Sequence, residues 1–216
     1  MKVFLTNRCN LDCIYCFKDK RKKEPELNEI IRKISKARKK IILKGGEPLV
    51  RKDILDILKY AKSRKLKIGL ETNGILLNNK ILKYADELYF VFDTINFEDW
   101  KRITKKDRKS YNKSIKGILL AKKANKKVYI DSLLTKLNFK SLEKTKEFCD
   151  KNGFILRVLE NKSVSGFDYN DSIALGIEYA KKILGKDKNI IYICAPKKRL
   201  SNKEKPKYYR KGGRQK

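Results

Sequence analysis

The sequence predicts an α/β protein, a partial (β/α)6 barrel of parallel strands with outer helices. Short apolar runs alternate with longer amphipathic segments along most of the chain, and this alternation is typical of successive βα units. The chain of 216 residues is shorter than the roughly 250 residues of an eight-unit barrel, but it is long enough for six units. Polar motifs follow several of the apolar runs, as expected where parallel strands end at a common edge.

The strands are predicted where apolar residues form short, nearly uninterrupted runs. The run Leu88–Phe92 is apolar throughout, as expected for a parallel strand that is buried on both faces. In chain order the predicted strands are residues 2–6, 41–43, 66–70, 88–92, 128–134 and 154–159, and a seventh apolar run covers residues 189–193.

The helices are predicted where apolar residues recur every three or four positions. Leu27, Ile30, Ile31 and Ile34, for example, fall on one face of a helix. The predicted helices are residues 26–39, 53–64, 81–85, 97–104, 111–124, 139–152 and 172–184. The sequence shows no internal repeat beyond this alternation.

A single domain is predicted for residues 1–195, followed by a basic C-terminal tail at residues 196–216. The tail has low hydrophobicity and a single acidic residue, Glu204, so we expect it to be flexible and solvated. Its basic residues are interleaved with Tyr208 and Tyr209, a composition that also suits RNA binding through phosphate contacts and base stacking. The solvated tail is the favoured interpretation.

The composition is strongly basic, with 56 lysines and arginines, 25 acidic residues and a formal net charge of +31. Such a charge attracts anionic small molecules, RNA or acidic proteins, although a lysine-rich proteome would also explain it. No run of 18 apolar residues is present, so we expect no membrane span. The N-terminus is predicted to be a strand rather than a signal peptide. The unpaired cysteines then predict a reducing, cytoplasmic location.

Three cysteines within eight residues, Cys9, Cys13 and Cys16, carry the chemistry that the sequence predicts. The spacing C-x3-C-x2-C lets one loop direct three thiolates at three irons of an iron–sulfur cluster. Such clusters are usually held by four cysteine thiolates. The remaining iron would be free to bind a substrate or cosubstrate. A zinc site completed by Cys149 or Cys194 is the alternative, and a disulfide framework is disfavoured because the cysteines are few for the length.

Polar motifs follow the next three predicted strands. Gly45-Gly46-Glu47-Pro48 follows the second strand, Glu71-Thr72-Asn73-Gly74 the third, and Asp93-Thr94 the fourth. The paired glycines would let the backbone approach a ligand closely, so a side chain at Gly46 is expected to weaken ligand binding. Because parallel strands end at one edge of a barrel, the three motifs are predicted to meet the cysteine loop there.

These motifs together resemble the radical S-adenosylmethionine (SAM) superfamily, whose fold is a partial TIM-like barrel. The resemblance implies that Cys9, Cys13 and Cys16 hold one [4Fe-4S] cluster and that the methionine end of SAM binds the fourth iron. It also implies that Tyr15 contacts the adenine and that the Gly45–Pro48 motif meets the amino group of SAM. Thr72 and Asn73 are expected to approach SAM as well.

Within that superfamily, residues 1–161 most resemble the branch that contains the GTP 3′,8-cyclases of molybdenum-cofactor synthesis. The resemblance implies further SAM contacts at Asp93, Asp131 and Leu159. It is carried by residues 92–95, 100–104, 131, 138 and 156–160.

The chain also departs from the cyclase pattern. Those cyclases hold a second cluster with three more cysteines, whereas Cys194 is the single cysteine after residue 160. Val91 and Asp131 stand where the branch usually has Ser and Asn. The resemblance therefore implies the radical SAM core but not the cyclase activity.

The expected function is [4Fe-4S]-dependent reductive cleavage of SAM to a 5′-deoxyadenosyl radical that abstracts hydrogen from a small molecule or nucleotide. The expected partners are SAM, a reduced electron donor such as ferredoxin or flavodoxin, and an anionic substrate or RNA. RNA modification and activation of a glycyl-radical enzyme are the alternatives within the family. A non-catalytic iron–sulfur or zinc protein is the alternative of another class. The oligomeric state and the substrate are not predicted by the sequence.

Overall fold

The computed structural model describes residues 1–16, 23–160 and 176–193. The predicted basic tail, the boundary near residue 195 and the first residues of the last predicted helix lie outside the described residues. Cys194 lies outside them as well.

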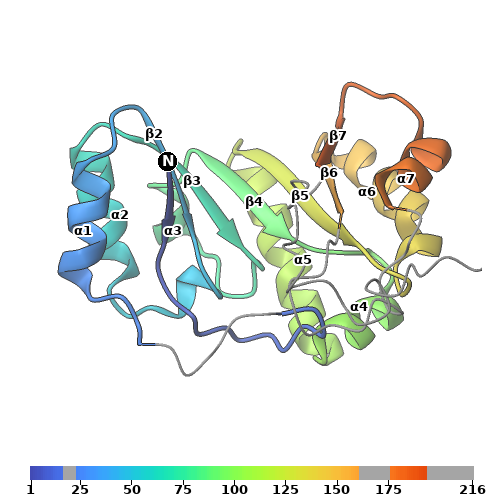
Figure 1. Cartoon of the computed structure of the whole chain (residues 1–216), viewed down its shortest axis with the longest axis horizontal. Helices are drawn as coiled ribbons and strands as arrows, with labels where there is room; N and C mark the ends of the chain where they lie inside the picture. Colours follow the sequence, from blue (N-terminus) through green and yellow to red (C-terminus); the bar gives the residue numbers. More distant parts are fainter. Residues whose placement is uncertain (17–22, 161–175, 194–216) are drawn as a thin grey trace, which may run out of the picture.

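One parallel sheet of seven strands forms the centre of the described structure (Figure 1). Each strand pairs in parallel with the next one in the chain, so the spatial order is the chain order. The predicted α/β fold with parallel strands is confirmed, and the seventh apolar run forms a strand that extends the sheet beyond the sixth. Strands β1 and β7 are the two edges, so the barrel is open. The strands are β1 (Lys2–Phe4), β2 (Lys40–Lys44), β3 (Lys67–Thr72), β4 (Glu87–Val91), β5 (Lys127–Leu134), β6 (Ile155–Glu160) and β7 (Ile190–Ile193).

The helices wrap around the outside of the curved sheet (Figure 1). They are α1 (Leu27–Ser35), α2 (Ile54–Ser63), α3 (Asn79–Leu82), α4 (Phe97–Thr104), α5 (Arg108–Lys123), α6 (Leu142–Asn152) and α7 (Gly176–Leu184), with short 3-10 turns η1 (Pro48–Val50) and η2 (Phe139–Ser141).

Several predicted helix boundaries shift by a few residues, and α3 covers residues 79–82 rather than 81–85. Two of the shifts have clear local reasons. Helix α5 begins three residues before the predicted start, because the Asp107 carboxylate caps it by accepting from the Ser110 N–H at 2.9 Å. Helix α1 ends at Ser35 rather than at residue 39, because the chain needs the residues after Ser35 to turn into β2, which begins at Lys40.

The two faces of the sheet differ in burial, as the period of two along a strand requires. The face under the helices carries fully buried apolar residues on every central strand, among them Leu43, Leu70, Phe90, Ile130 and Leu156. The inner face is mixed and carries charged and tyrosine side chains, among them Lys44, Glu71, Tyr89, Tyr129 and Arg157. The core therefore lies between sheet and helices, and the inner face is left for polar contacts.

An aromatic cluster fixes α4 and α5 beneath β4. Trp100 of α4 is buried, and its ring meets Tyr111 of α5 edge-on with centroids 5.4 Å apart. The Tyr111 hydroxyl donates to the carbonyl of Ile95 at 2.6 Å, so the polar end of the ring is satisfied. This packing places the last turn of α4 against the cysteine loop.

Candidate functional site

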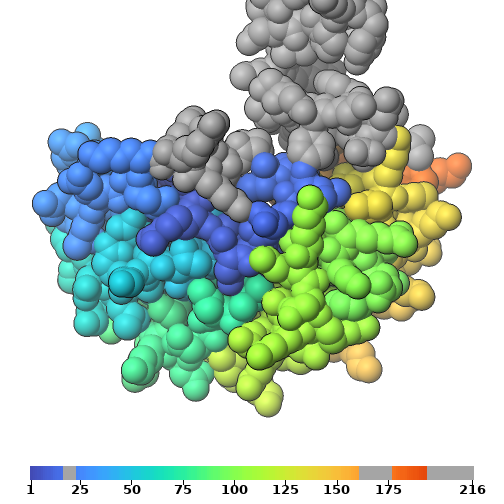
Figure 2. Space-filling model, turned by 90° about the horizontal axis from the view of Figure 1, so that it is seen from below, coloured from blue at the N-terminus to red at the C-terminus, as the bar shows by residue number. Residues whose placement is uncertain are grey.

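The predicted polar motifs meet at the carboxyl edge of the sheet. Figure 2 looks onto this edge from below, where the blue N-terminal loop lies between α1 and α2 on one side and the green α4–α5 region on the other. Hydrogen bonds connect the loop after β1 with the ends of β2, β3 and β4. The site is therefore assembled from four consecutive strand ends.

The cysteine loop is irregular, but its backbone is held in place. The N–H groups of Asp12 and Ile14 donate to the carbonyls of Thr104 and Ile103, at 3.1 and 2.9 Å. These carbonyls belong to the last turn of α4, where no helical partner exists for them. Leu11 is buried in the core, which leaves the neighbouring cysteine side chains partly exposed. The loop thus presents its thiols from a fixed frame.

The three thiols lie close enough to influence one another. Burial, the Asp93 carboxylate and the charges of Cys9 and Cys16 raise the pKa of the Cys13 thiol well above its usual range. Bound cations would offset the repulsion among three thiolates, since metal ligation deprotonates a thiol outright. The donor set therefore fits a positively charged iron–sulfur core.

The remaining described cysteine does not extend this set. Cys149 is fully buried and belongs to the hydrophobic core around α6. Among residues 1–16, 23–160 and 176–193, no three His, Cys, Asp or Glu side chains are arranged to hold a single metal ion. The described residues thus bring three sulfurs and no fourth to this loop, an arrangement that suits a multi-iron cluster better than tetrahedral zinc, which takes four ligands.

The glycines of the Gly45–Pro48 segment permit a close approach to the cysteine loop itself. The Gly46 N–H donates to the Thr6 carbonyl at 2.6 Å. A Cβ at Gly46 would lie 2.0 Å from the Arg8 carbonyl oxygen, and one at Gly45 would lie 2.7 Å from that of Thr6. We expected the glycines to serve the approach of a ligand, but the structure shows that they first serve backbone packing against the residues that precede Cys9.

Glu47 joins the ends of β2 and β3. Its buried carboxylate accepts from the Leu49 N–H at 3.0 Å, the Thr72 hydroxyl at 2.8 Å and the Asn73 N–H at 2.7 Å. The backbone of Glu47 is extended, because the following Pro48 disfavours helical geometry at this residue. Pro48 itself starts η1, at the position where proline needs no N–H partner. The Glu47 side chain thus fixes the scaffold of the edge.

Asn73 continues the connection towards the cysteines. Its side-chain amide donates to the Asn10 side-chain oxygen at 2.6 Å, and Asn10 directly follows Cys9. Gly74 has a φ of +81°, so the predicted Asn-Gly turn is present. Sequence reasoning missed Asn10, although its position between two cysteines was the available signal.

Tyr15 and Asp93 connect the loop with β4. The Tyr15 hydroxyl donates to one Asp93 oxygen at 2.6 Å, and the other oxygen accepts from the Leu133 N–H at 2.9 Å. Burial raises the pKa of Asp93 to about 6, although the Tyr15 bond acts in the opposite direction. Burial and Asp93 also raise the pKa of Tyr15.

Asn138, in the turn after β5, also holds the end of β4 in place. Its amide nitrogen donates to the carbonyls of Asp93 and Leu133, both at 2.9 Å, and its oxygen accepts from the Thr135 N–H at 2.8 Å. The side chain is fully buried, and its two donated bonds connect the end of β4, at Asp93, with the end of β5, at Leu133.

Asp131 and Leu159 lie further along the inner face. Asp131 forms a bidentate ion pair with Arg157 of β6. The Arg157 guanidinium also lies over the Tyr89 ring, 4.5 Å from its centroid, and Tyr89 stacks on Tyr129 at 4.6 Å. Leu159 is partly buried on β6 and pairs in register with Leu133. These two predicted positions belong to a charged and aromatic inner wall rather than to the cysteine loop.

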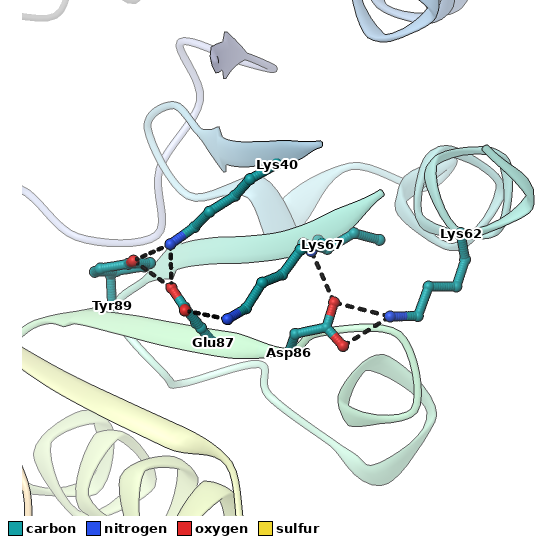
Figure 3. Close-up of polar contacts among 7 residues, drawn as sticks. Lys40, Lys62, Lys67, Asp86, Glu87 and Tyr89 are labelled. Carbon is teal, nitrogen blue, oxygen red and sulfur yellow. Dashed lines mark hydrogen bonds and ion pairs between the residues drawn. The ribbon is translucent and has the colours of Figure 1, made fainter. Parts of the chain in front are cut away.

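The amino edge of the sheet carries a different network (Figure 3). Glu87 accepts from the ammonium groups of Lys40 at 2.5 Å and Lys67 at 2.9 Å and from the Tyr89 hydroxyl at 2.5 Å. Burial alone would raise the pKa of Glu87, but these bonds lower it to about 2. Beside it, Asp86 binds Lys62 and the Ile68 N–H. No pattern in the sequence pointed to this network.

The chain matches a family model, the "Radical SAM superfamily", over residues 3–149. Among curated proteins it is 35% identical to the "Probable GTP 3′,8-cyclase" of Methanocaldococcus jannaschii over 190 residues, which are 80% of this chain and 63% of that protein. It is 29% identical to the "GTP 3′,8-cyclase" of Aliarcobacter butzleri, over 74% of this chain and 54% of that protein. The chain thus spans less than two thirds of these relatives.

Solved structures share the fold at low sequence identity. Streptococcus suis SuiB bound to S-adenosylmethionine matches with a TM-score of 0.70 and 17% identity, over 90% of this chain and 49% of that chain. The structure of anSMEcpe with bound AdoMet matches with a TM-score of 0.64 and 19% identity, over 85% and 57%. Within the part of the chain that the structure describes, no helix has the length and apolar character needed to cross a membrane.

Proposed function

Because the chain belongs to the radical SAM superfamily, we propose that the carboxyl edge of its sheet binds SAM beside a cluster held by Cys9, Cys13 and Cys16. The cofactors are a [4Fe-4S] cluster and SAM, as in the family. When bound, they supply the reductive cleavage of SAM to a 5′-deoxyadenosyl radical, which abstracts a hydrogen atom from a substrate. The protein supplies binding, orientation and protection from water.

The observation that carries this proposal is the hydrogen-bonded frame around the cysteine loop. None of its three cysteines forms a disulfide with another described residue, and its backbone is tied to α4 on one side and to the end of β2 on the other. A frame of this kind keeps the sulfurs in one arrangement, which a cluster with an open iron requires.

The proposed SAM contacts divide into direct and positioning residues. Tyr15, Thr72 and Asn73 present polar or aromatic groups at the edge, and the Gly45–Pro48 backbone passes directly beside the cysteine loop. Glu47 and Asp93 use their carboxylates to hold neighbouring strand ends. Asp131 and Leu159 face the barrel interior, so we propose that they border the space between SAM and substrate.

We also propose a small anionic substrate, with a purine nucleotide as the first to test. The matching relatives are named GTP 3′,8-cyclases. The inner face offers the stacked Tyr89–Tyr129 pair, Arg157 and Lys44, and the last two are already paired with acids. The cyclisation itself is not part of the proposal, because the chain spans less than two thirds of the cyclases that it matches.

The test is anaerobic reconstitution of the chain with iron and sulfide, followed by incubation with SAM and dithionite. We expect one four-iron cluster and formation of 5′-deoxyadenosine, which rises when GTP is present. Cys13→Ala should lose the cluster, whereas Cys149→Ala should keep it because Cys149 is a core residue. Full iron content in Cys13→Ala, or no SAM cleavage by the loaded wild-type protein, would contradict the proposal.

A further inference from the structure

Four basic side chains surround a hollow at the end of α4. Lys101, Arg102, Lys105 and Lys106 line it together with Glu98 and Asp107, and its volume is about 530 Å³. Lys101, Arg102 and Lys105 are exposed, and none of the four forms an ion pair with another described residue. We call these four residues the α4 patch. It is a positively charged concave surface that the described structure leaves available.

The α4 patch adjoins the cysteine loop through the same turn of helix. The carbonyls of Ile103 and Thr104, which lie between Arg102 and Lys105 in the chain, accept from Ile14 and Asp12. Asp12 and Ile14 flank Cys13. The contact between the blue loop and the green α4–α5 region is visible in Figure 2. A molecule seated on the patch would therefore lie beside the cysteine loop.

Helix electrostatics explains part of this charge but not all of it. Cations near a helix C-terminus are stabilised by the helix dipole, which accounts for Lys101 and Arg102 at the end of α4. Helix α5 begins immediately afterwards, and cations at an N-terminus are disfavoured. Yet its first turn contains Arg108 and Lys109 and no acid. The Asp107 carboxylate caps this helix, however, and Arg108 lies over the Phe97 ring, so the start of α5 has local compensation. The positive charge without an ion pair among the described residues is that of the α4 patch.

We propose that the α4 patch docks an acidic one-electron carrier protein of the ferredoxin or flavodoxin class. The carrier gives one electron to the cluster, so the carrier is oxidised by one electron and the [4Fe-4S] core is reduced from 2+ to 1+, with no other reactant. Electron transfer weakens steeply with distance, so the carrier must dock beside the cysteine loop. Complementary charge speeds such an encounter and fixes its orientation. The inference rests on the proposed cluster.

The test compares two triple variants that remove the same charge. Lys101→Gln, Arg102→Gln and Lys105→Gln together remove three of the four positive charges of the α4 patch and leave Lys106 in place. Lys33→Gln, Lys36→Gln and Lys39→Gln together neutralise three exposed lysines at and just beyond the end of α1, which lies at the opposite end of the sheet from α4 in Figure 1. Both are made in the full chain and reconstituted anaerobically. Reduction of the cluster by a reduced acidic ferredoxin is followed in a stopped-flow spectrometer at several salt concentrations, and dithionite serves as a small reductant without a docking site.

We expect the α4-patch variant to be reduced by ferredoxin on the order of tenfold more slowly at low salt, the scale of electrostatic steering. Its salt dependence should flatten, its affinity for oxidised ferredoxin in a titration should fall, and its reduction by dithionite should match that of wild type. The α1 variant should behave like wild type in all four measurements.

Three results would overturn the inference. An equal loss with dithionite would indicate damage to the cluster, and an equal loss in the α1 variant would indicate an effect of net charge alone. Unchanged ferredoxin reduction with weakened binding of transfer RNA would assign the surface to nucleic acid. If dithionite cannot reduce the wild-type protein, or no cluster forms, then the proposed function fails rather than the docking site.

Discussion

The two edges of the sheet shift the pKa of a buried acid in opposite directions. At the amino edge, Glu87 binds two lysine ammonium groups, and its pKa falls to about 2. At the carboxyl edge, Asp93 is equally buried, but the hydrogen-bond partners of its carboxylate are the neutral Tyr15 hydroxyl and the Leu133 N–H. Burial therefore raises the pKa of Asp93 to about 6.

This difference suggests a division of roles, in which the amino edge stabilises the fold and the carboxyl edge holds the groups that we propose for chemistry. The amino edge is electrostatically complete, because each buried charge meets its counter-charge within the chain. The carboxyl edge gathers thiols and an acid, and we propose that a cation completes it, since both the SAM sulfonium and the irons are cationic. This division agrees with the rule that parallel barrels carry their active sites at the carboxyl ends of the strands. The predictions below test it from the largest expected effect to the smallest.

Gly46→Ala should cause the largest loss, because the new methyl group would lie 2.0 Å from the Arg8 carbonyl oxygen. The backbone before Cys9 must then move, so we expect the variant to lose most of its iron after anaerobic reconstitution, and SAM cleavage with it. Gly153→Ala is the control, since a Cβ there meets nothing within 4 Å. Its φ of +70° costs about 1 kcal/mol of stability, but the iron content should stay normal.

This first prediction differs from the one that the sequence alone gives. From the sequence, a side chain at position 46 should weaken SAM binding while the cluster survives. A Gly46→Ala protein with full iron content and weak SAM affinity would support that earlier interpretation and contradict the packing seen here.

Glu47→Gln should cause the second-largest loss. The buried carboxylate accepts three hydrogen bonds, and a glutamine amide would place an N–H group against at least one of those donors. We expect a loss of roughly 2 kcal/mol in the free energy of unfolding, measured by urea denaturation of the cluster-free protein, together with weaker SAM binding. Glu98→Gln, an exposed acid on α4, is the matched control and should change neither quantity.

Glu87→Gln should affect stability alone. Lys40 and Lys67 are 38% and 54% exposed and can return to water, so we expect a loss of about 1 kcal/mol at neutral pH. The wild-type protein should lose this extra stability as the pH falls from about 4.3, the ordinary pKa of Glu, through about 2, the pKa of Glu87 in the folded protein. Urea denaturation at pH 7, 4 and 3 should show the two proteins converging in stability. A loss of SAM cleavage in the loaded variant at pH 7 would break the proposed division between the edges.

The sequence predicted the carboxyl edge far better than the amino edge, for a physical reason. Cys9, Gly46 and Asn73 stand in short local motifs whose residue types have few other uses. Lys40, Lys67 and Glu87 are distant in the chain and meet only through strand register. In a chain with 56 basic residues, the sequence alone does not distinguish a lysine that pairs with a buried acid from the many lysines on the surface. The role of Gly46 was likewise beyond the sequence, because it depends on how closely β2 approaches the cysteine loop.

Lys62→Ala should have the smallest effect. The Lys62 ammonium binds both oxygens of Asp86 at 2.7 and 2.8 Å, but both side chains are about one-third exposed. Solvent screens such a pair, so we expect a loss of about 0.5 kcal/mol in the free energy of unfolding, with normal iron content and SAM cleavage. Asp86 would keep its bond from the Ile68 N–H at 2.8 Å, and that bond holds the turn into β4. Asp86→Ala should therefore cost clearly more than Lys62→Ala, because it leaves the N–H without its partner. Equal losses in the two variants would show that the ion pair, rather than the backbone bond, stabilises this part of the amino edge.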